Sequence, residues 1–158
     1  MEISVIEQEM SDLDWFAIDL EYKIAHFSSA GGSLPRSVSI SAEDNAVVTS
    51  YFQSLIELPT AFIINPHLQL PEEIKTPKQQ SDYFRTYAFY SKCGLYSFAR
   101  NETYVRGSDR NFDYKLITSP SNQRTFKDIP YNIQQALVRT KYTGLFNVSE
   151  KINLTEIS

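Results

Sequence analysis

The chain has 158 residues and a net charge of −4, and its ten Tyr and ten Phe make it rich in aromatic side chains. This length suits a single globular domain over residues 1–158, and the acidic balance argues against general nucleic-acid binding, which needs a basic surface. The single Cys93 excludes an internal disulfide, no apolar run approaches the roughly 18 residues of a membrane span, and no secretion signal is seen, so we expect a cytoplasmic protein without membrane contact.

The first strong pattern in chain order is a β-hairpin. Residues 1–11 alternate only weakly, which leaves a strand, a helical turn or a loose arm open. Phe16, Ile18 and Leu20 then fall on one side of an extended chain, and residues 24–27 resume the alternation after a short gap. Such a gap returns the chain antiparallel to itself, although the turn has no Asn-Gly or Asp-Gly signal to fix the register.

A pair of glycines, Gly31 and Gly32, follows the hairpin in a run of small residues. Glycine permits a positive φ and leaves backbone N–H groups accessible. This bend could present its amides to a partner or to an anion. The alternative is that the glycines simply turn the chain away from the sheet toward the next helix.

Three helices are expected from their caps and from apolar residues at helical spacing. Ser41 can cap a helix that runs to Glu57, where a proline soon follows. Residues 76–77, a Thr-Pro pair, open a second helix with an aromatic stripe, and Gly94 suits a left-handed C-cap. A third helix opens at residues 128–130.

The remaining apolar runs favour sheet. A wholly apolar run at residues 61–64 is consistent with a buried strand or a packed loop. The other expected strands are residues 95–100, 103–106, 112–118 and 142–148, with a hairpin loop at 107–111. We therefore predict an α+β fold, in which an antiparallel twisted sheet built from hairpins carries two or three helices packed on one face.

The charges are divided unevenly along the chain. Residues 1–44 hold nine acidic side chains against Lys23 and Arg36, a net charge of −7. Residues 85–127 hold eight basic side chains against three acidic ones, a net charge of +5. The folded molecule could therefore have an acidic and a basic side, or the two segments could pack together and neutralise each other.

The usual catalytic motifs are missing, and with only His26 and His67 present we expect no metal site and no cofactor. The best catalytic candidate is His26 as general base, because its side chain can titrate near neutrality. Asp14 or Asp19 would orient it across the hairpin, and the amides at residues 31–32 would hold an anionic substrate. The alternative is a structural histidine on a sheet face.

The hairpin and one later segment carry a recognisable pattern. It consists of Trp15, Phe16, Ala17, Asp19, Ile24, His26, Phe27, Ala30, Gly31, Gly32, Pro35 and the Gly-Leu-Tyr-Ser segment at residues 94–97. This pattern resembles the opening and a later part of a group of small uncharacterised bacterial proteins, which are often encoded near toxin and immunity genes. The resemblance brings no catalytic residues, and it implies an interaction protein.

We therefore expect a protein-binding module, in the form of an immunity-type inhibitor that acts by surface complementarity. Its expected contact residues are Trp15, Asp19, His26, Gly31 and Gly32, and its expected partner is a cationic, toxin-like protein that the acidic segment would attract. The alternative is a small enzyme that uses His26 on an anionic substrate. A homodimer with a structural role is a third hypothesis.

Overall fold

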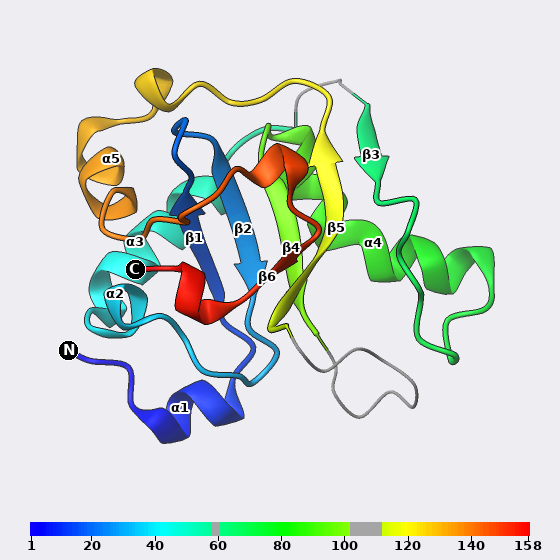
Figure 1. Cartoon of the computed structure of the whole chain (residues 1–158), viewed down its shortest axis with the longest axis horizontal. Helices are drawn as coiled ribbons and strands as arrows, with labels where there is room; N and C mark the ends of the chain where they lie inside the picture. The colour runs from blue at the N-terminus through cyan, green and yellow to red at the C-terminus, as the bar shows by residue number, and fades with distance from the viewer. Residues whose placement is uncertain (58–60, 102–111) are drawn as a thin grey trace.

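The computed structural model describes residues 1–57, 61–101 and 112–158, and within them the strands form one six-stranded sheet (Figure 1). The strands follow the order β1-β2-β4-β5-β3, and β6 pairs with β5. Their bounds are β1 Asp14–Ile18, β2 Ile24–Ser28, β3 Phe62–Ile64, β4 Tyr96–Arg100, β5 Tyr114–Pro120 and β6 Lys151–Ile152.

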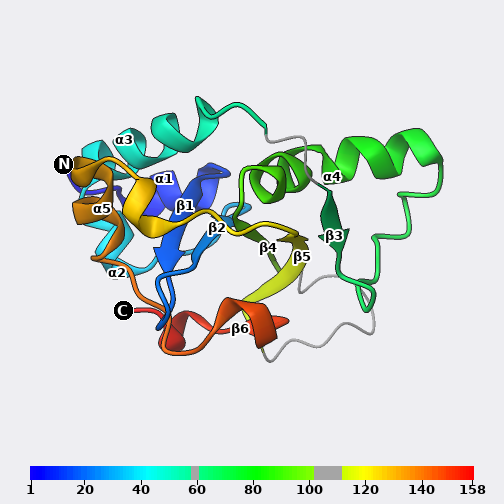
Figure 2. The same cartoon turned by 90° about the horizontal axis from the view of Figure 1, so that it is seen from above.

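Helices and sheet together confirm the α+β prediction. The α-helices are α1 Val5–Met10, α2 Arg36–Ser39, α3 Ala42–Gln53, α4 Pro77–Lys92 and α5 Tyr131–Leu137, and the 3-10 turns are η1 Phe126–Asp128, η2 Phe146–Val148 and η3 Leu154–Glu156. In Figure 2 the longer helices α3 and α4 lie along one side of the sheet, and the C-terminal segment with β6 lies along the other. Both faces of the sheet are therefore covered.

Two hydrophobic cores lie on the two faces of the sheet. Successive side chains of β1 belong alternately to one core and to the other. Phe16 and Ile18 join the core on the helix side, together with Phe52 of α3. Trp15 and Ala17 join the opposite core under the C-terminal segment. Because successive strand side chains point to opposite faces, a strand buried on both sides has apolar residues at every position.

The sheet is mixed, which corrects the prediction of a purely antiparallel one. The pairs β1–β2, β4–β5, β3–β5 and β5–β6 are antiparallel, whereas β2 and β4 run parallel. Parallel neighbours need a long crossover. Here residues 29–95 supply it, since the chain leaves β2 and traverses α2, α3, β3 and α4 before it enters β4.

The helix-boundary signals are mostly confirmed. The hydroxyl of Ser41 accepts a hydrogen bond from the backbone N–H of Asp44 at 3.1 Å, and Thr76 forms a capping box with Gln79 at the start of α4. Gly94 follows α4 with a φ of +97°, the left-handed conformation that favours glycine. The helix that begins after Ser41 ends at Gln53, four residues short of Glu57.

Other expectations meet different outcomes. Residues 1–11, for which a strand, a helical turn or a loose arm was open, contain the short helix α1. Among the described residues, β3 within residues 61–64 pairs with β5 at the end of the strand order and is partly exposed, so it is not a buried strand. The strand expected over 142–148 is wrong, because this stretch holds an isolated bridge at Tyr142 and then η2. The strand expected at 103–106 and the loop at 107–111 lie outside the described residues.

Candidate functional site

The hairpin brings His26 and Asp14 together, as the catalytic hypothesis required. His26 lies opposite Phe16 in the register of β1 and β2, so Asp14 is its diagonal neighbour on the same face of the sheet. His26 Nε2 donates to Asp14 Oδ1 at 2.7 Å, and His26 Nδ1 lies 2.7 Å from the hydroxyl of Ser97 on β4. An Asp–His–Ser chain of hydrogen bonds therefore crosses three strands.

Helix α4 closes this chain from above the sheet. The ring of Tyr90 stacks on the His26 imidazole with a centroid distance of 3.9 Å, and its hydroxyl donates to Asp14 Oδ2 at 3.2 Å. The amide of Gln53 donates to the same oxygen at 3.4 Å. Burial acts to raise the pKa of Asp14, but the hydrogen bond and charge of His26, with the bonds from Tyr90 and Gln53, outweigh it and hold this pKa below its ordinary value.

The arrangement is sealed. Of the three residues in the Asp–His–Ser chain, His26 and Ser97 are both 0% exposed, and Asp14, whose side chain is 22% exposed, is the one that reaches the surface. A catalytic base must contact the proton that it removes, and a nucleophile must contact its substrate. The carboxylate that the hypothesis required is present, whereas the pocket is not, so His26 has the geometry of a structural histidine.

Asp19, the other predicted carboxylate partner, does not contact His26. It lies just beyond the end of β1, where its Oδ1 accepts hydrogen bonds from the backbone N–H groups of Glu21 and Lys23, each at 2.9 Å. Its Oδ2 accepts from the N–H of Phe146 at 2.9 Å. Asp19 therefore holds the hairpin turn and ties it to the C-terminal segment, which corrects its assignment to a site with His26.

The Gly31–Gly32 bend does not form an anion cradle, because its amides are already used. The N–H of Gly31 donates to the carbonyl of Ser11 at 3.1 Å, and that of Gly32 donates to the carbonyl of Ser29 at 2.9 Å. Gly31 has a φ of +77°, and a Cβ there would fall 2.9 Å from the backbone oxygen of Glu9. The glycine therefore allows α1 to rest against the bend.

Trp15, expected as an interface anchor, is completely buried. Its ring stacks on Phe27 at a centroid distance of 4.0 Å, and its Nε1 donates to the hydroxyl of Tyr114 at 3.1 Å. This is the burial expected of a large aromatic side chain whose polar atom has found a partner. The ring is therefore not available to another protein in this conformation.

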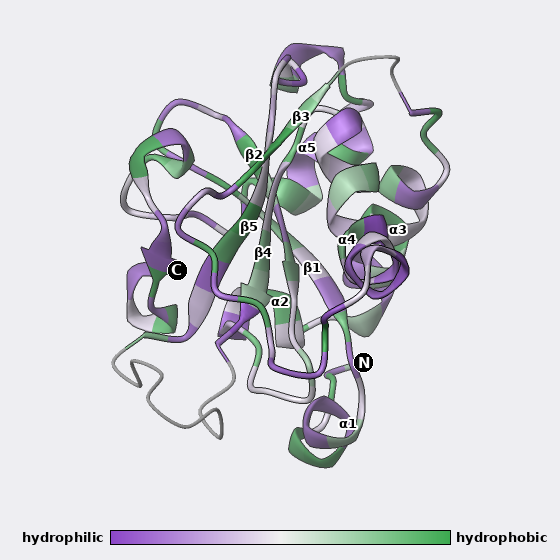
Figure 3. Ribbon diagram, turned by 90° about the vertical axis from the view of Figure 1, so that its right-hand side faces the viewer, coloured by the Kyte–Doolittle hydropathy of each residue, from purple (hydrophilic) through white to green (hydrophobic). Residues whose placement is uncertain are grey.

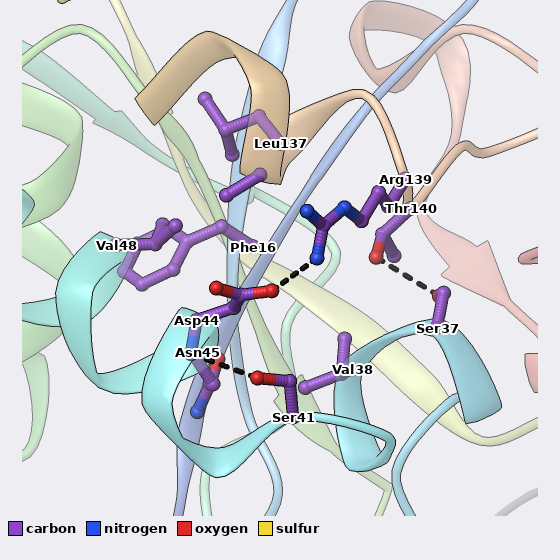
Figure 4. Close-up of a pocket in the computed structure, with 11 residues that line it drawn as sticks. Phe16, Ser37, Val38, Ser41, Asp44, Asn45, Val48, Leu137, Arg139 and Thr140 are labelled. Carbon is purple, nitrogen blue, oxygen red and sulfur yellow. Dashed lines mark hydrogen bonds and ion pairs between the residues drawn. The ribbon is translucent and has the colours of Figure 1, made fainter. Parts of the chain in front are cut away.

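A small cavity lies where α2, α3 and α5 meet (Figure 4). An ion pair between Asp44 and Arg139 spans it, and Thr140 Oγ1 donates to Ser37 Oγ at 2.9 Å. Its volume of about 30 Å³ has room for one or two water molecules. It is a joint between helices and is too small for a substrate.

Helix α1 is the surface feature that sequence reasoning missed. Its buried residue is Gln8, whereas Val5, Ile6 and Met10 are 68%, 68% and 81% exposed. At 100° per residue, Val5, Glu9, Ile6 and Met10 occupy one continuous face and Gln8 points the opposite way. This angular pattern is visible in the sequence, but it is meaningful only once residues 5–10 are known to be helical.

Within residues 1–57, 61–101 and 112–158, no group of three or more His, Cys, Asp or Glu side chains could hold a metal ion. None of the helices described in these ranges has the length and apolar character needed to cross a membrane. No family model, curated protein or solved structure matches the chain. The functional argument therefore depends on the chain's own surfaces.

Proposed function

We propose that the chain is a protein-binding module that engages a cationic partner through the exposed face of α1. The observation that carries this proposal is the inverted burial of that helix, in which a glutamine faces the body and three large apolar residues face solvent. Exposed apolar side chains gathered on one element, with charged residues among them, are typical of interaction sites. In Figure 3, α1 projects from the foot of the molecule.

The orientation of α1 is fixed by specific bonds. Gln8 Nε2 donates to the carbonyl of Ile3 at 2.9 Å, and Gln8 Oε1 accepts from the N–H of Leu34 at 2.9 Å. Ser4 caps the helix by accepting from the N–H of Glu7 at 3.1 Å. Both ends of the glutamine amide are satisfied in this position, so the apolar face is held outward before any partner binds. A preorganised surface loses less entropy on binding.

The charge on α1 indicates the chemistry of the partner. Glu9 lies between Val5 and Ile6 around the helix, and Glu7 lies beside Met10. An apolar groove with basic residues on its rim would cover the apolar side chains and pair with both carboxylates. A second copy of the chain fits less well, because pairing α1 with α1 would bring four carboxylates into one interface.

An immunity-type inhibitor is the narrower form of this proposal, in which the partner is a toxin-like protein and binding blocks its activity. The support for that form is the resemblance of the hairpin sequence to proteins encoded near toxin and immunity genes. The Gly31–Gly32 bend belongs to the same surface, since the C-terminal end of α1 rests on Gly31. Its contribution would be to position α1.

The test is a pull-down from the native host at low salt, followed by reconstitution of any stoichiometric complex from purified proteins. The double substitution Ile6→Ser with Met10→Ser should weaken the purified complex at least about tenfold, because it removes two apolar contacts. Glu7→Gln with Glu9→Gln should slow association and reduce its dependence on salt.

Matched controls keep the experiment specific. Ile56→Ser removes another exposed apolar side chain, and Glu72→Gln with Glu73→Gln removes two other exposed carboxylates, all away from α1. These variants should bind as the original chain does. A complex that the α1 variants leave unchanged, the absence of any stoichiometric protein partner, or a doubled mass of the chain alone that the α1 variants abolish would each overturn the proposal.

A further inference from the structure

A second surface feature, independent of α1, lies at the tip of the β1–β2 hairpin. There the turn residues 21–23 lie beside the segment 123–127, which leads into η1 (Figures 1 and 2). Between them is an open cleft with a volume of about 620 Å³, completed by Gln134 of α5. This volume is in the range of small-molecule sites.

The cleft is cationic although the chain as a whole is acidic. Lys23, Arg124 and Lys127 line it, and Glu21 is the one carboxylate among its lining residues. At the turn, Glu21 Oε1 lies 3.9 Å from Lys23 Nζ. Arg124 and Lys127 close the basic segment that the sequence shows over residues 85–127, so the fold brings part of that segment's charge to a concave surface.

Arg124 is positioned before any ligand binds. Its Nε donates to the carbonyl of Cys93 at 2.7 Å, and its backbone N–H donates to the carbonyl of Gly94 at 3.0 Å. The side-chain bond occupies Nε and fixes the plane of the guanidinium group, whose two terminal nitrogens retain the paired donors that suit a phosphate or a carboxylate. An anion in the cleft would therefore meet an oriented donor.

The cleft also has an aromatic wall. The rings of Tyr22 and Phe126 pack with a centroid distance of 5.1 Å and an interplanar angle of 52°. Tyr22 has a φ of +60°, a left-handed conformation at the turn, and its side chain is half exposed. Gln134 holds η1 in place by donating from Nε2 to the carbonyls of Phe126 and Ile129.

We propose that this cleft binds a small anion that carries a planar aromatic group. The anionic part, a phosphate or a carboxylate, would pair with Arg124, Lys23 and Lys127. The aromatic part would lie against Tyr22 and Phe126. A nucleoside monophosphate and a simple aryl phosphate share this chemistry, and the experiment is arranged to separate them.

Binding is measured by titrating the full chain with four probes: AMP, phenyl phosphate, adenosine and inorganic phosphate. Probes that combine both groups should bind at least about tenfold more tightly than adenosine or inorganic phosphate alone. A preference for AMP over phenyl phosphate identifies a nucleotide, and the reverse identifies an aryl anion. If inorganic phosphate matches both combined probes, or if adenosine does, the proposal is overturned.

Two variants locate the site. Lys127→Gln should weaken the combined probes several-fold and flatten their salt dependence, whereas Lys78→Gln on α4 should change nothing. Tyr22→Asn removes the ring while keeping a residue that tolerates a positive φ, so it should reduce the aromatic advantage and leave phosphate binding as it was. Thermal unfolding confirms that each variant is folded, and probe binding that neither Lys127→Gln nor Tyr22→Asn changes would contradict the site.

Discussion

Asp14 and His26 are joined by a hydrogen bond of 2.7 Å between adjacent strands, at the point where β1 begins and α3 and α4 cover the sheet. An ionised carboxylate can only accept, so His26 Nε2 carries the proton of this bond. The other carboxylate oxygen accepts from Tyr90 and Gln53. One acidic side chain therefore connects β1 with β2, α3 and α4. Its removal should destabilise the packing of these helices on the sheet.

Replacing Asp14 by Asn should change how stability depends on pH. The folded-state pKa of Asp14 is held below its ordinary value, so its ionisation stabilises the fold above the ordinary pKa of about 4, and this contribution is lost as pH falls through the lowered value. Asp14→Asn should lower the free energy of unfolding by about 1–3 kcal/mol at pH 7. It should also reduce the further loss of stability as pH falls into the acid range, which is the acid limb of the stability curve. Urea unfolding between pH 2 and 7 measures both effects.

Asp82→Asn is the matched control, because Asp82 forms an exposed pair with Arg85. Exposed pairs contribute little, so this variant should keep the acid limb of the original chain. If Asp14→Asn and the original chain lose stability in parallel below pH 4, the assigned role of the Asp14 carboxylate is wrong.

Tyr90 should make the fold sensitive to alkali. Burial and the nearby charge of Asp14 raise the pKa of Tyr90. A raised pKa means that stability is fully present below the ordinary value of about 10 and is lost as pH rises above it. Tyr90→Phe removes the bond to Asp14 and should cost about 1 kcal/mol at pH 7, yet it should lose less stability than the original chain between pH 9 and 11.

Unfolding at those pH values, followed by circular dichroism, measures this difference. Tyr131→Phe is the control, since Tyr131 is 72% exposed and should not alter the alkaline limb. Tyr96 and Tyr114 also have raised pKa values through burial, so Tyr90→Phe should reduce the alkaline loss and leave part of it. An unchanged slope for Tyr90→Phe would refute the assignment.

The elements that the sequence predicted correctly are those that local rules decide. Alternation identified the β1–β2 hairpin, and hydroxyl caps identified the start of α3 and of α4. The parallel pairing of β2 with β4 depends on a crossover of residues 29–95, and no local pattern encodes it. No local pattern predicts the burial of His26 either. Alternation shows which face of the sheet carries its side chain, but it does not show which elements cover that face.

The choice between Asp14 and Asp19 as the partner of His26 shows the limit of prediction from the sequence. Asp14 is the first residue of β1 and Asp19 follows its last residue, and the register that pairs Phe16 with His26 selects Asp14. That register is set by a turn in which Tyr22 adopts a positive φ and Asp19 accepts two backbone N–H groups. Without an Asn-Gly or Asp-Gly signal, the sequence did not reveal this turn.

Ser97 and Asp14 should be energetically coupled through His26, which contacts both. Ser97→Ala removes the hydroxyl beside Nδ1 and should cost about 1–2 kcal/mol, because a buried ring nitrogen loses its partner. The double variant Ser97→Ala with Asp14→Asn should lose free energy of unfolding by an amount that differs from the sum of the two single losses by about 0.5–2 kcal/mol. Urea unfolding at pH 7 completes the cycle, and strict additivity would show that the imidazole does not link the two residues.

Trp15 provides an internal reporter, because it is the chain's single tryptophan and is completely buried. Its emission should be shifted to the blue relative to free tryptophan and should resist quenching by iodide until the chain unfolds. Trp15→Phe should cost about 2–4 kcal/mol, since it loses contact area in the core and the bond to the Tyr114 hydroxyl. A partner that docks on α1 should leave the emission unchanged. Quenching of Trp15 emission by iodide in the folded chain would instead show that the ring reaches solvent. Trp15 would then be accessible to a partner, as the sequence predicted.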